Sequence, residues 1–272
     1  MPFNILFPDS RSDPLDVERE VAGPDTVLVN ARKDRFEAIE LSAWENCDAI
    51  ITRFVPIDAK VIPHLKKARI VVRNGVGYDN CDLELLGAAG IAVCNVPDYG
   101  TTEVADTAVA MMLAFARGTA IYDATLRQDP TALWTHTHNV TARRLRGATY
   151  GVIGMGRIGT ASALRARAFG MNVVFYDPAL SIGAELSFGF TRANKLDDLL
   201  KVADVITIHA PLTPETNKMI NADAVSKIKP GAYLISTARG PICDTGALLE
   251  GLKSNRLLAV GLDVLDRKST RL

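Results

Sequence analysis

Short apolar runs alternate with amphipathic stretches through the first hundred residues, and each run is bounded by Gly, Pro or Asp. Apolar runs of this length, separated by helical patterns, are typical of buried strands in a parallel sheet that helices cover. The strands are expected at Asn4–Phe7, Thr26–Asn30, Ala49–Thr52, Ala68–Arg73 and Ile91–Asn95. Helices are expected at Pro14–Val21, Arg32–Glu40 and Asp82–Ala89. The pattern predicts an α/β unit over this segment.

The segment Thr101–Arg117 is apolar around most of its circumference, which predicts a long helix buried between domains or between subunits. Thr101 or Thr102 is expected to cap this helix. Because the helix is expected to be buried between domains or subunits, we place a domain boundary just before it, near residues 99 and 100. The polar stretch Gln128–Arg146 is expected to be a surface arm. Strands are then expected at Thr149–Ile153, Asn172–Asp177, Val202–His209, Ala232–Thr237 and Leu257–Val264.

A glycine-rich turn, Gly154-x-Gly156-x-x-Gly159, follows the strand Thr149–Ile153 and precedes a helix expected at Thr160–Phe169. Asp177 ends the next strand, 18 residues after Gly159. A strand, this turn, a helix and then an acidic residue form the context in which the motif binds a dinucleotide. The glycines allow a tight turn, close approach of a pyrophosphate and close helix packing, and the helix N-terminus attracts the phosphates. Asp177 would accept the ribose hydroxyls and repel a 2′-phosphate, so the pattern favours NAD over NADP.

Three polar side chains, His209, Arg239 and Asp263, lie at the carboxyl ends of the later strands. Ligands of open α/β sheets bind at that edge. A guanidinium at Arg239 offers a fork of donors to the carboxylate or carbonyl oxygen of a 2-oxo acid. Spacing alone leaves a second reading equally open, in which Arg239 pairs with a phosphate or with Asp263.

Several of these segments together resemble the D-isomer-specific 2-hydroxyacid dehydrogenases. They come in the family's order and run from about residue 70 to 265. The amino-acid sequence of these segments most resembles the branch that contains the phosphoglycerate dehydrogenases and the C-terminal-binding proteins. The segments are Asn74–Asn80, Val96–Asp106, Val152–Gly159, His209–Thr216, Ser236–Gly240 and Leu262–Val264.

The resemblance implies two Rossmann-like or flavodoxin-like domains with parallel sheets, and a role for each matched residue. The loop Gly75, Val76 and Gly77 would receive the substrate carboxylate, and Arg239 would be the catalytic residue that binds substrate. The residues matched to the cofactor site, Arg239 among them, would contact the cofactor, NAD. They are Thr101, Gly154, Gly156, Arg157, Ile158, Gly159, Asp177, His209, Ala210, Pro211, Thr216, Thr237, Ala238, Arg239 and Asp263.

The sequence also departs from the family near its end. The family mechanism uses a Glu five residues after Asp263, where this chain has Lys268, and a His about two dozen residues later, beyond Leu272. We therefore expect a C-terminally truncated chain of low activity, whose second domain lacks its last strand and the helix that returns to the first domain. The expected divisions are 1–99 (substrate-binding domain, N-terminal part), 100–265 (incomplete NAD-binding domain) and 266–272. The last segment is expected to be a non-native tail, because it matches the translation of a widely used DNA adapter.

Composition narrows the partners. Lys+Arg and Asp+Glu both number 31, so the net charge is zero and nothing indicates direct binding of nucleic acid. No apolar run approaches the roughly 20 residues of a membrane span, so no membrane partner is expected. The protein is expected to be cytoplasmic. The cysteines show no C-x-x-C spacing and are expected to be buried free thiols, and no metal site is expected. The family resemblance implies a small 2-hydroxy or 2-oxo acid as substrate, and the apolar helix makes us expect a homodimer. The alternative is an NAD(H)-sensing interaction protein, like the corepressors of the C-terminal-binding branch.

Overall fold

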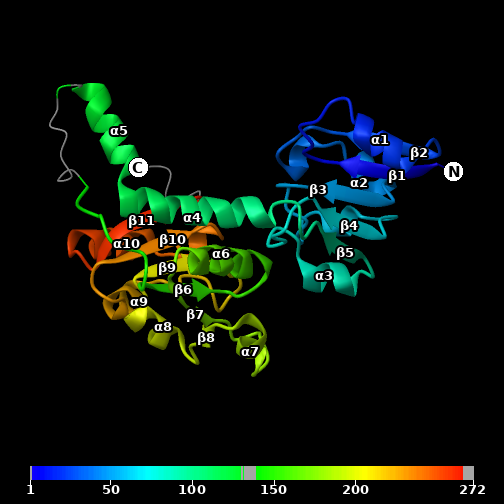
Figure 1. Cartoon of the computed structure of the whole chain (residues 1–272). Coiled ribbons are helices and arrows are strands. Elements are labelled where there is room, and N and C mark those ends of the chain that lie inside the picture. Colours follow the sequence, from blue (N-terminus) through cyan, green and yellow to red (C-terminus); the bar gives the residue numbers. More distant parts are fainter. Residues whose placement is uncertain (1, 130, 132–138, 266–272) are drawn as a thin grey trace. The chain divides into compact units, whose positions relative to one another are not determined.

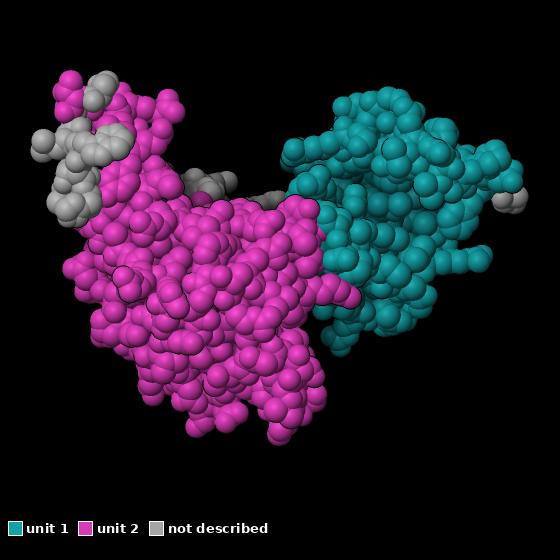
Figure 2. Space-filling view, in the orientation of Figure 1, with its two compact units in different colours: residues 1–99 teal, residues 100–272 magenta. Residues whose placement is uncertain are grey.

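The chain divides into two compact units, residues 1–99 and 100–272 (Figure 2). The computed structural model describes residues 2–129, 131 and 139–265. Each unit has one parallel sheet with helices against it, which confirms the predicted α/β class.

The first unit has five parallel strands in the order β2-β1-β3-β4-β5 (Figure 1). This is the flavodoxin-like order. A core of buried side chains, among them Leu6, Trp44, Ile50, Val71 and Leu86, lies between the sheet and its helices. The elements are β1 (Phe3–Phe7), α1 (Asp16–Ala22), β2 (Thr26–Asn30), η1 (Phe36–Ala38), α2 (Leu41–Asn46), β3 (Ala49–Thr52), η2 (Ile62–His64), β4 (Ile70–Arg73), α3 (Leu83–Ala88) and β5 (Ala92–Asn95).

The helix expected over Arg32–Glu40 is wrong. Arg32 takes a left-handed φ of 55°, and the Lys33 N–H donates to the Pro8 carbonyl at 2.7 Å. These features tie the segment to the loop after β1, so only the short 3-10 turn η1 forms there, and α2 begins later, at Leu41.

The second unit has six parallel strands in the order β11-β10-β9-β6-β7-β8. They fill all six places of the usual doubly wound order. The elements are α4 (Thr101–Arg117), α5 (Thr119–Gln128), β6 (Thr149–Ile153), α6 (Arg157–Ala168), β7 (Asn172–Tyr176), α7 (Ala184–Phe188), β8 (Thr191–Arg192), α8 (Leu196–Val202), β9 (Val205–Ile208), α9 (Ala222–Lys227), β10 (Ala232–Ser236), η4 (Gly240–Ile242), α10 (Thr245–Lys253) and β11 (Leu257–Leu262).

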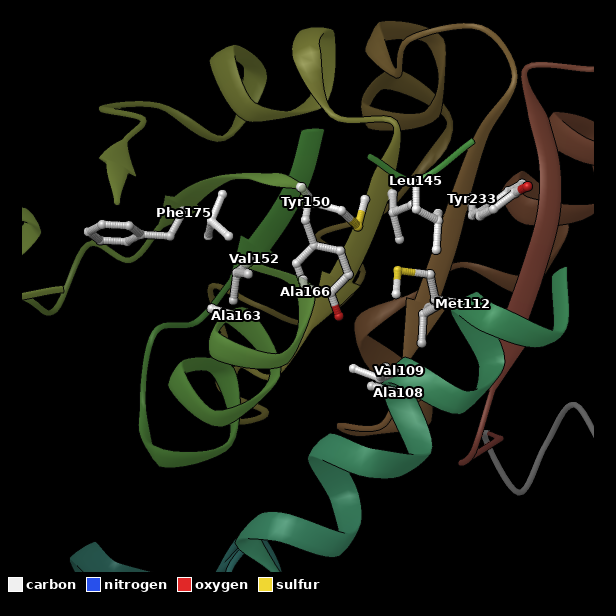
Figure 3. Close-up of a cluster of buried hydrophobic side chains, with 14 of the residues drawn as sticks. Ala108, Val109, Met112, Leu145, Tyr150, Val152, Ala163, Ala166, Phe175 and Tyr233 are labelled. Carbon is white, nitrogen blue, oxygen red and sulfur yellow. The ribbon is translucent and has the colours of Figure 1, made fainter. Parts of the chain in front are cut away.

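Helices cover both faces of this sheet. On one face α4 and α6 bury a cluster that includes Val109, Met112, Tyr150 and Tyr233 (Figure 3). On the other face α8, α9 and α10 bury a second cluster around Leu199 and Ile206. Strands covered on both faces explain why β6, β9 and β10 read as continuous apolar runs.

Helix α4 spans Thr101–Arg117 as expected. Its buried side chains pack on α6, β10 and β11 of its own unit and form part of the core there. Its N-cap is Gly100, so neither Thr101 nor Thr102 caps it.

The segment expected as a surface arm is partly anchored. Asn139 and Leu145 are buried, and the Arg143 guanidinium donates to the carbonyls of Asp204 and Gly231 at 2.8 and 2.7 Å. Residues 130 and 132–138 of this stretch lie outside the described residues.

No single helix of the described chain is long and apolar enough to cross a membrane. Helices α4 and α5 pass that test only as a pair, with a 58° bend between them.

Candidate functional site

The glycine-rich turn between β6 and α6 has a shape that only glycine permits at its first position. Gly154 has a φ of 89°, and its N–H donates to the Tyr176 carbonyl at 2.9 Å. A Cβ at Gly154 would lie 2.8 Å from the backbone nitrogen of Ala210. The turn therefore lies directly against the loop that follows β9.

The other two glycines face different surroundings. A Cβ at Gly159 would lie 2.0 Å from the Gly154 carbonyl oxygen, so this glycine lets α6 approach the turn. A Cβ at Gly156 would meet no heavy atom within 4 Å. Gly156 is the N-cap of α6 and has no side chain to accept its first N–H groups. An anion can therefore approach the N-terminus of α6 from this open side.

Asp177 follows β7 and is fixed toward the turn. One carboxylate oxygen accepts the Met155 N–H at 2.8 Å, and the other accepts the Ala179 N–H at 2.9 Å. The acid that the sequence assigns to the ribose is thus bound to the backbone of the glycine-rich turn itself.

The His209 side chain points into the protein. Its Nε2 lies 2.9 Å from the Thr207 hydroxyl, and its Nδ1 lies 3.2 Å from the Thr237 hydroxyl. Burial lowers the pKa of His209 from 6.5 to about 4, so the imidazole is neutral at physiological pH. The His209 side chain therefore links the ends of β9 and β10.

The same loop is closed by its own hydrogen bonds. The Thr216 hydroxyl donates to the Pro211 carbonyl at 2.6 Å and accepts the Thr213 N–H at 2.8 Å. The two residues that the sequence selects in this loop, Pro211 and Thr216, are thus in direct contact, and Ala210 lies against the glycine-rich turn.

Arg239 follows two buried residues, Thr237 and Ala238, at the end of β10. Its guanidinium is half-buried, and Nη1 donates to the Ala238 carbonyl at 3.0 Å. Asp263 follows the neighbouring strand β11, where its N–H donates to the Ser236 carbonyl at 3.0 Å and its side chain is exposed. The carboxyl ends of β6, β9 and β10 therefore gather the turn, the His209 loop and Arg239 along one edge of the sheet.

In the first unit, the loop after β4 carries the residues assigned to the substrate carboxylate. Gly75 has a φ of 155°, and a Cβ there would lie 1.5 Å from Nη1 of Arg73. The Asn95 amide donates to the Val76 carbonyl at 2.7 Å, which steadies the loop before Gly77.

A buried hydroxyl at the start of α4 has no hydrogen-bond partner among the described residues. It belongs to Thr101, which the family resemblance places near the nicotinamide. An open phosphate approach at Gly156, a carboxylate at Asp177 and an unpartnered hydroxyl at Thr101 all fit a bound dinucleotide.

Sequence reasoning missed Thr207, Ser162 and Tyr150. The hydroxyl of Tyr150 lies 2.7 Å from that of Ser162, and all three side chains are fully buried. A polar residue inside an apolar strand, such as Thr207 in VITI, is the signal that could have pointed to a buried partner.

The described residues contain no group of His, Cys, Asp and Glu side chains that could hold a metal ion. His136 and His138, which invite a metal interpretation in the sequence, lie outside the described residues.

Comparison with known proteins gives a consistent result. The profile of the D-isomer specific 2-hydroxyacid dehydrogenase, NAD binding domain, matches residues 109–271. The chain is 38% identical over 225 residues to the D-3-phosphoglycerate dehydrogenases of Mycobacterium leprae and Mycobacterium bovis. That match covers 82% of this chain and 42% of either relative, so the chain spans less than half the length of these relatives.

Solved structures agree with this match. The D-lactate dehydrogenase of Aquifex aeolicus, complexed with NAD and lactic acid, is similar with a TM-score of 0.86 at 30% identity, over 98% of this chain and 78% of that one. A glyoxylate reductase from Paecilomyes thermophila is similar with a TM-score of 0.88 at 28% identity, over 98% and 83%.

The matched NAD binding domain contains the glycine-rich turn, Asp177, the His209 loop and Arg239, and the same elements come together in the second unit. The cofactor predicted from the turn, NAD, is the one that the family's domain binds. The chain belongs to the D-isomer specific 2-hydroxyacid dehydrogenase family.

Proposed function

We propose that this protein is an NAD-dependent oxidoreductase that moves a hydride between the nicotinamide and C2 of a D-2-hydroxy acid or 2-oxo acid. One observation carries the proposal. The glycine-rich turn contacts the loop after β9 at Gly154, and His209 of that loop is hydrogen-bonded to Thr237, two residues before Arg239. A dinucleotide site and a guanidinium are thus parts of one connected edge.

The residues of this edge have distinct tasks in the proposed reaction. Bound NADH supplies the hydride. The N–H groups at the start of α6 hold its phosphates, and Asp177 accepts from its ribose. Arg239 holds the 2-oxo acid and polarises its carbonyl. The carbonyl oxygen must also gain a proton as the hydride arrives.

We assign the first unit, residues 1–99, to substrate binding through Gly75, Val76 and Gly77. Their loop follows a parallel strand at its carboxyl end, where backbone N–H groups can receive a carboxylate. Lactate and glyoxylate, which name two of the similar structures, are a 2-hydroxy acid and a 2-oxo acid, and this chemistry supports the substrate class.

Calorimetric titration with NADH tests cofactor binding, and loss of NADH absorbance with pyruvate, glyoxylate or hydroxypyruvate then tests the reaction. Arg239→Gln should keep the NADH affinity and lose turnover, whereas the control Arg117→Gln, an exposed arginine at the end of α4, should match the wild type. Wild-type protein that takes up no NADH would contradict the proposal.

We also propose that the protein forms a homodimer through α5. This helix has no buried residue, and Ile121 and Leu126 are 39% and 36% exposed on it. A second copy would cover these apolar side chains. Sedimentation velocity should show a dimer that Ile121→Glu dissociates, and a wild-type monomer at micromolar concentration would refute this part.

A further inference from the structure

The loop that follows β7 folds around a single guanidinium. Arg192 lies on β8, and its Nη2 donates to the carbonyls of Asp177 and Leu180 at 3.0 and 2.8 Å. Its Nη1 donates to the Ser181 carbonyl at 2.7 Å. Three carbonyls of the loop therefore point toward one side chain.

A carboxylate completes this arrangement. Glu185 Oε2 lies 3.5 Å from Nη1 of Arg192, and both carboxylate oxygens also accept the N–H of Gly183, at 3.2 and 3.1 Å. The Arg192 side chain is only 14% exposed, and its Cζ lies 5.9 Å from the ring centre of Phe175. The guanidinium is thus held by the core of the unit as well as by the loop.

The loop carries the residue that matters for the cofactor. Arg192 fixes the main-chain carbonyl of Asp177, while the Asp177 carboxylate accepts the Met155 N–H of the glycine-rich turn at 2.8 Å. The backbone of Asp177 is therefore held on one side by Arg192 and its side chain is held on the other by the turn. Both contacts set where the carboxylate can meet a ribose.

In other dinucleotide sites, an arginine near this position favours NADP, because a guanidinium close to the ribose accommodates the 2′-phosphate of that cofactor. In this structure both terminal nitrogens of Arg192 already donate to carbonyls, and Glu185 neutralises its charge. Turning toward a phosphate would break these bonds inside a largely buried site, which costs the desolvation of each abandoned carbonyl.

We propose that Arg192 is a positioning residue that fixes Asp177 and thereby makes the site select NAD over NADP. This inference rests on the proposed function, since it concerns the same cofactor. Lysine cannot replace Arg192 fully, because its single ammonium lacks the planar fork that reaches three carbonyls.

The experiment measures the Kd of NADH and of NADPH by calorimetry for the wild type, Arg192→Gln and Arg192→Lys. The matched control is Arg167→Gln, an exposed arginine of the same unit whose Cζ lies 5.2 Å from the Phe190 ring centre. Arg192→Gln should raise the Kd of NADH about tenfold and leave the weak binding of NADPH unchanged. The ratio of the NADPH Kd to the NADH Kd should therefore fall about tenfold. Arg192→Lys should give an intermediate ratio, and the control should leave it unchanged.

A second comparison separates positioning from support of the fold. In an Asp177→Asn background, Arg192→Gln should no longer change the ratio, because the two residues act as one unit. If Arg192→Gln weakens both cofactors equally, the residue is only structural, and if it weakens NADPH alone, it is a phosphate receptor. Either result overturns the inference, as does an unchanged ratio. Wild-type protein without affinity for NADH would instead overturn the proposed function itself.

Discussion

The clearest prediction contrasts two alanine substitutions three residues apart. Gly156→Ala places a methyl group where no heavy atom lies within 4 Å, on a residue with an ordinary φ of −75°. The protein itself therefore tolerates the change. The loss of glycine at a helix N-cap costs about 0.5–1 kcal/mol, and the stiffer unfolded chain regains about 0.4–1 kcal/mol. Stability should stay within about 1 kcal/mol of the wild type.

Gly159→Ala meets the opposite situation. Its new methyl would lie 2.0 Å from the Gly154 carbonyl oxygen, where ordinary contacts begin at 3.4 Å. Because the obstacle is backbone, α6 has to move by more than an ångström. We expect a loss of about 1–3 kcal/mol, as for other overpacked sites.

Urea unfolding and NADH calorimetry on both variants separate the two effects. Gly156→Ala should keep the urea midpoint but weaken NADH binding at least tenfold, or about 1.4 kcal/mol, because the methyl group lies where the pyrophosphate approaches. Gly159→Ala should lower both the urea midpoint and the affinity for NADH. Gly87→Ala, whose Cβ also meets no heavy atom within 4 Å and which lies on α3 of the first unit, is the control. Unchanged NADH affinity in Gly156→Ala would refute the argument.

Three further outcomes follow. Arg239→Lys should lower kcat/KM for a 2-oxo acid about 100-fold at constant NADH affinity, because an ammonium lacks the bidentate fork; steady-state kinetics measures this. Burial lowers the pKa of His209 from 6.5 to about 4, so the folded protein binds a proton there less readily than the unfolded chain. About 3 kcal/mol of folding stability is therefore present above pH 6.5 and is lost as the pH falls toward 4. Urea unfolding should show a weaker pH dependence for His209→Asn than for the wild type. Cys94 is exposed, contrary to the expected burial of the cysteines, so a thiol reagent should label it quickly. Cys243 should react only on unfolding, because burial raises its pKa to about 12.

The features that the sequence predicts well depend on local chemistry. The strand, glycine-rich turn and helix from Thr149 onward follow from residues that have few other uses, and the observed strand β6 has the predicted bounds. The helix Thr101–Arg117 also matches residue for residue, because its pattern is long and unbroken by glycine or proline.

The features that it misses depend on contacts between distant segments. The segment from Arg32 follows the loop after β1 because Lys33 bonds to Pro8, and a helical pattern does not contain that information. The surroundings of α4 could not be read from its composition, since an apolar helix can lie in any core. His209 turns inward because hydroxyls from β9 and from the end of β10 meet only once the strands are in register.

The candidate site shows the same division. A sequence motif is enough to identify one part of the site, because that part depends on backbone conformation and a single charge. Its residues are Gly154, Gly156, Gly159 and Asp177. Arg192 lies in a short polar stretch without periodicity, and its importance emerges only from the three carbonyls that converge on it.

A crystal structure of the protein with NADH tests the central claim most directly. The account predicts the pyrophosphate against the N–H groups that begin α6, on the open side of Gly156, with a ribose hydroxyl on Asp177 and the nicotinamide directed toward Arg239. A cofactor bound elsewhere, or one with its nicotinamide ring turned away from Arg239, would contradict it.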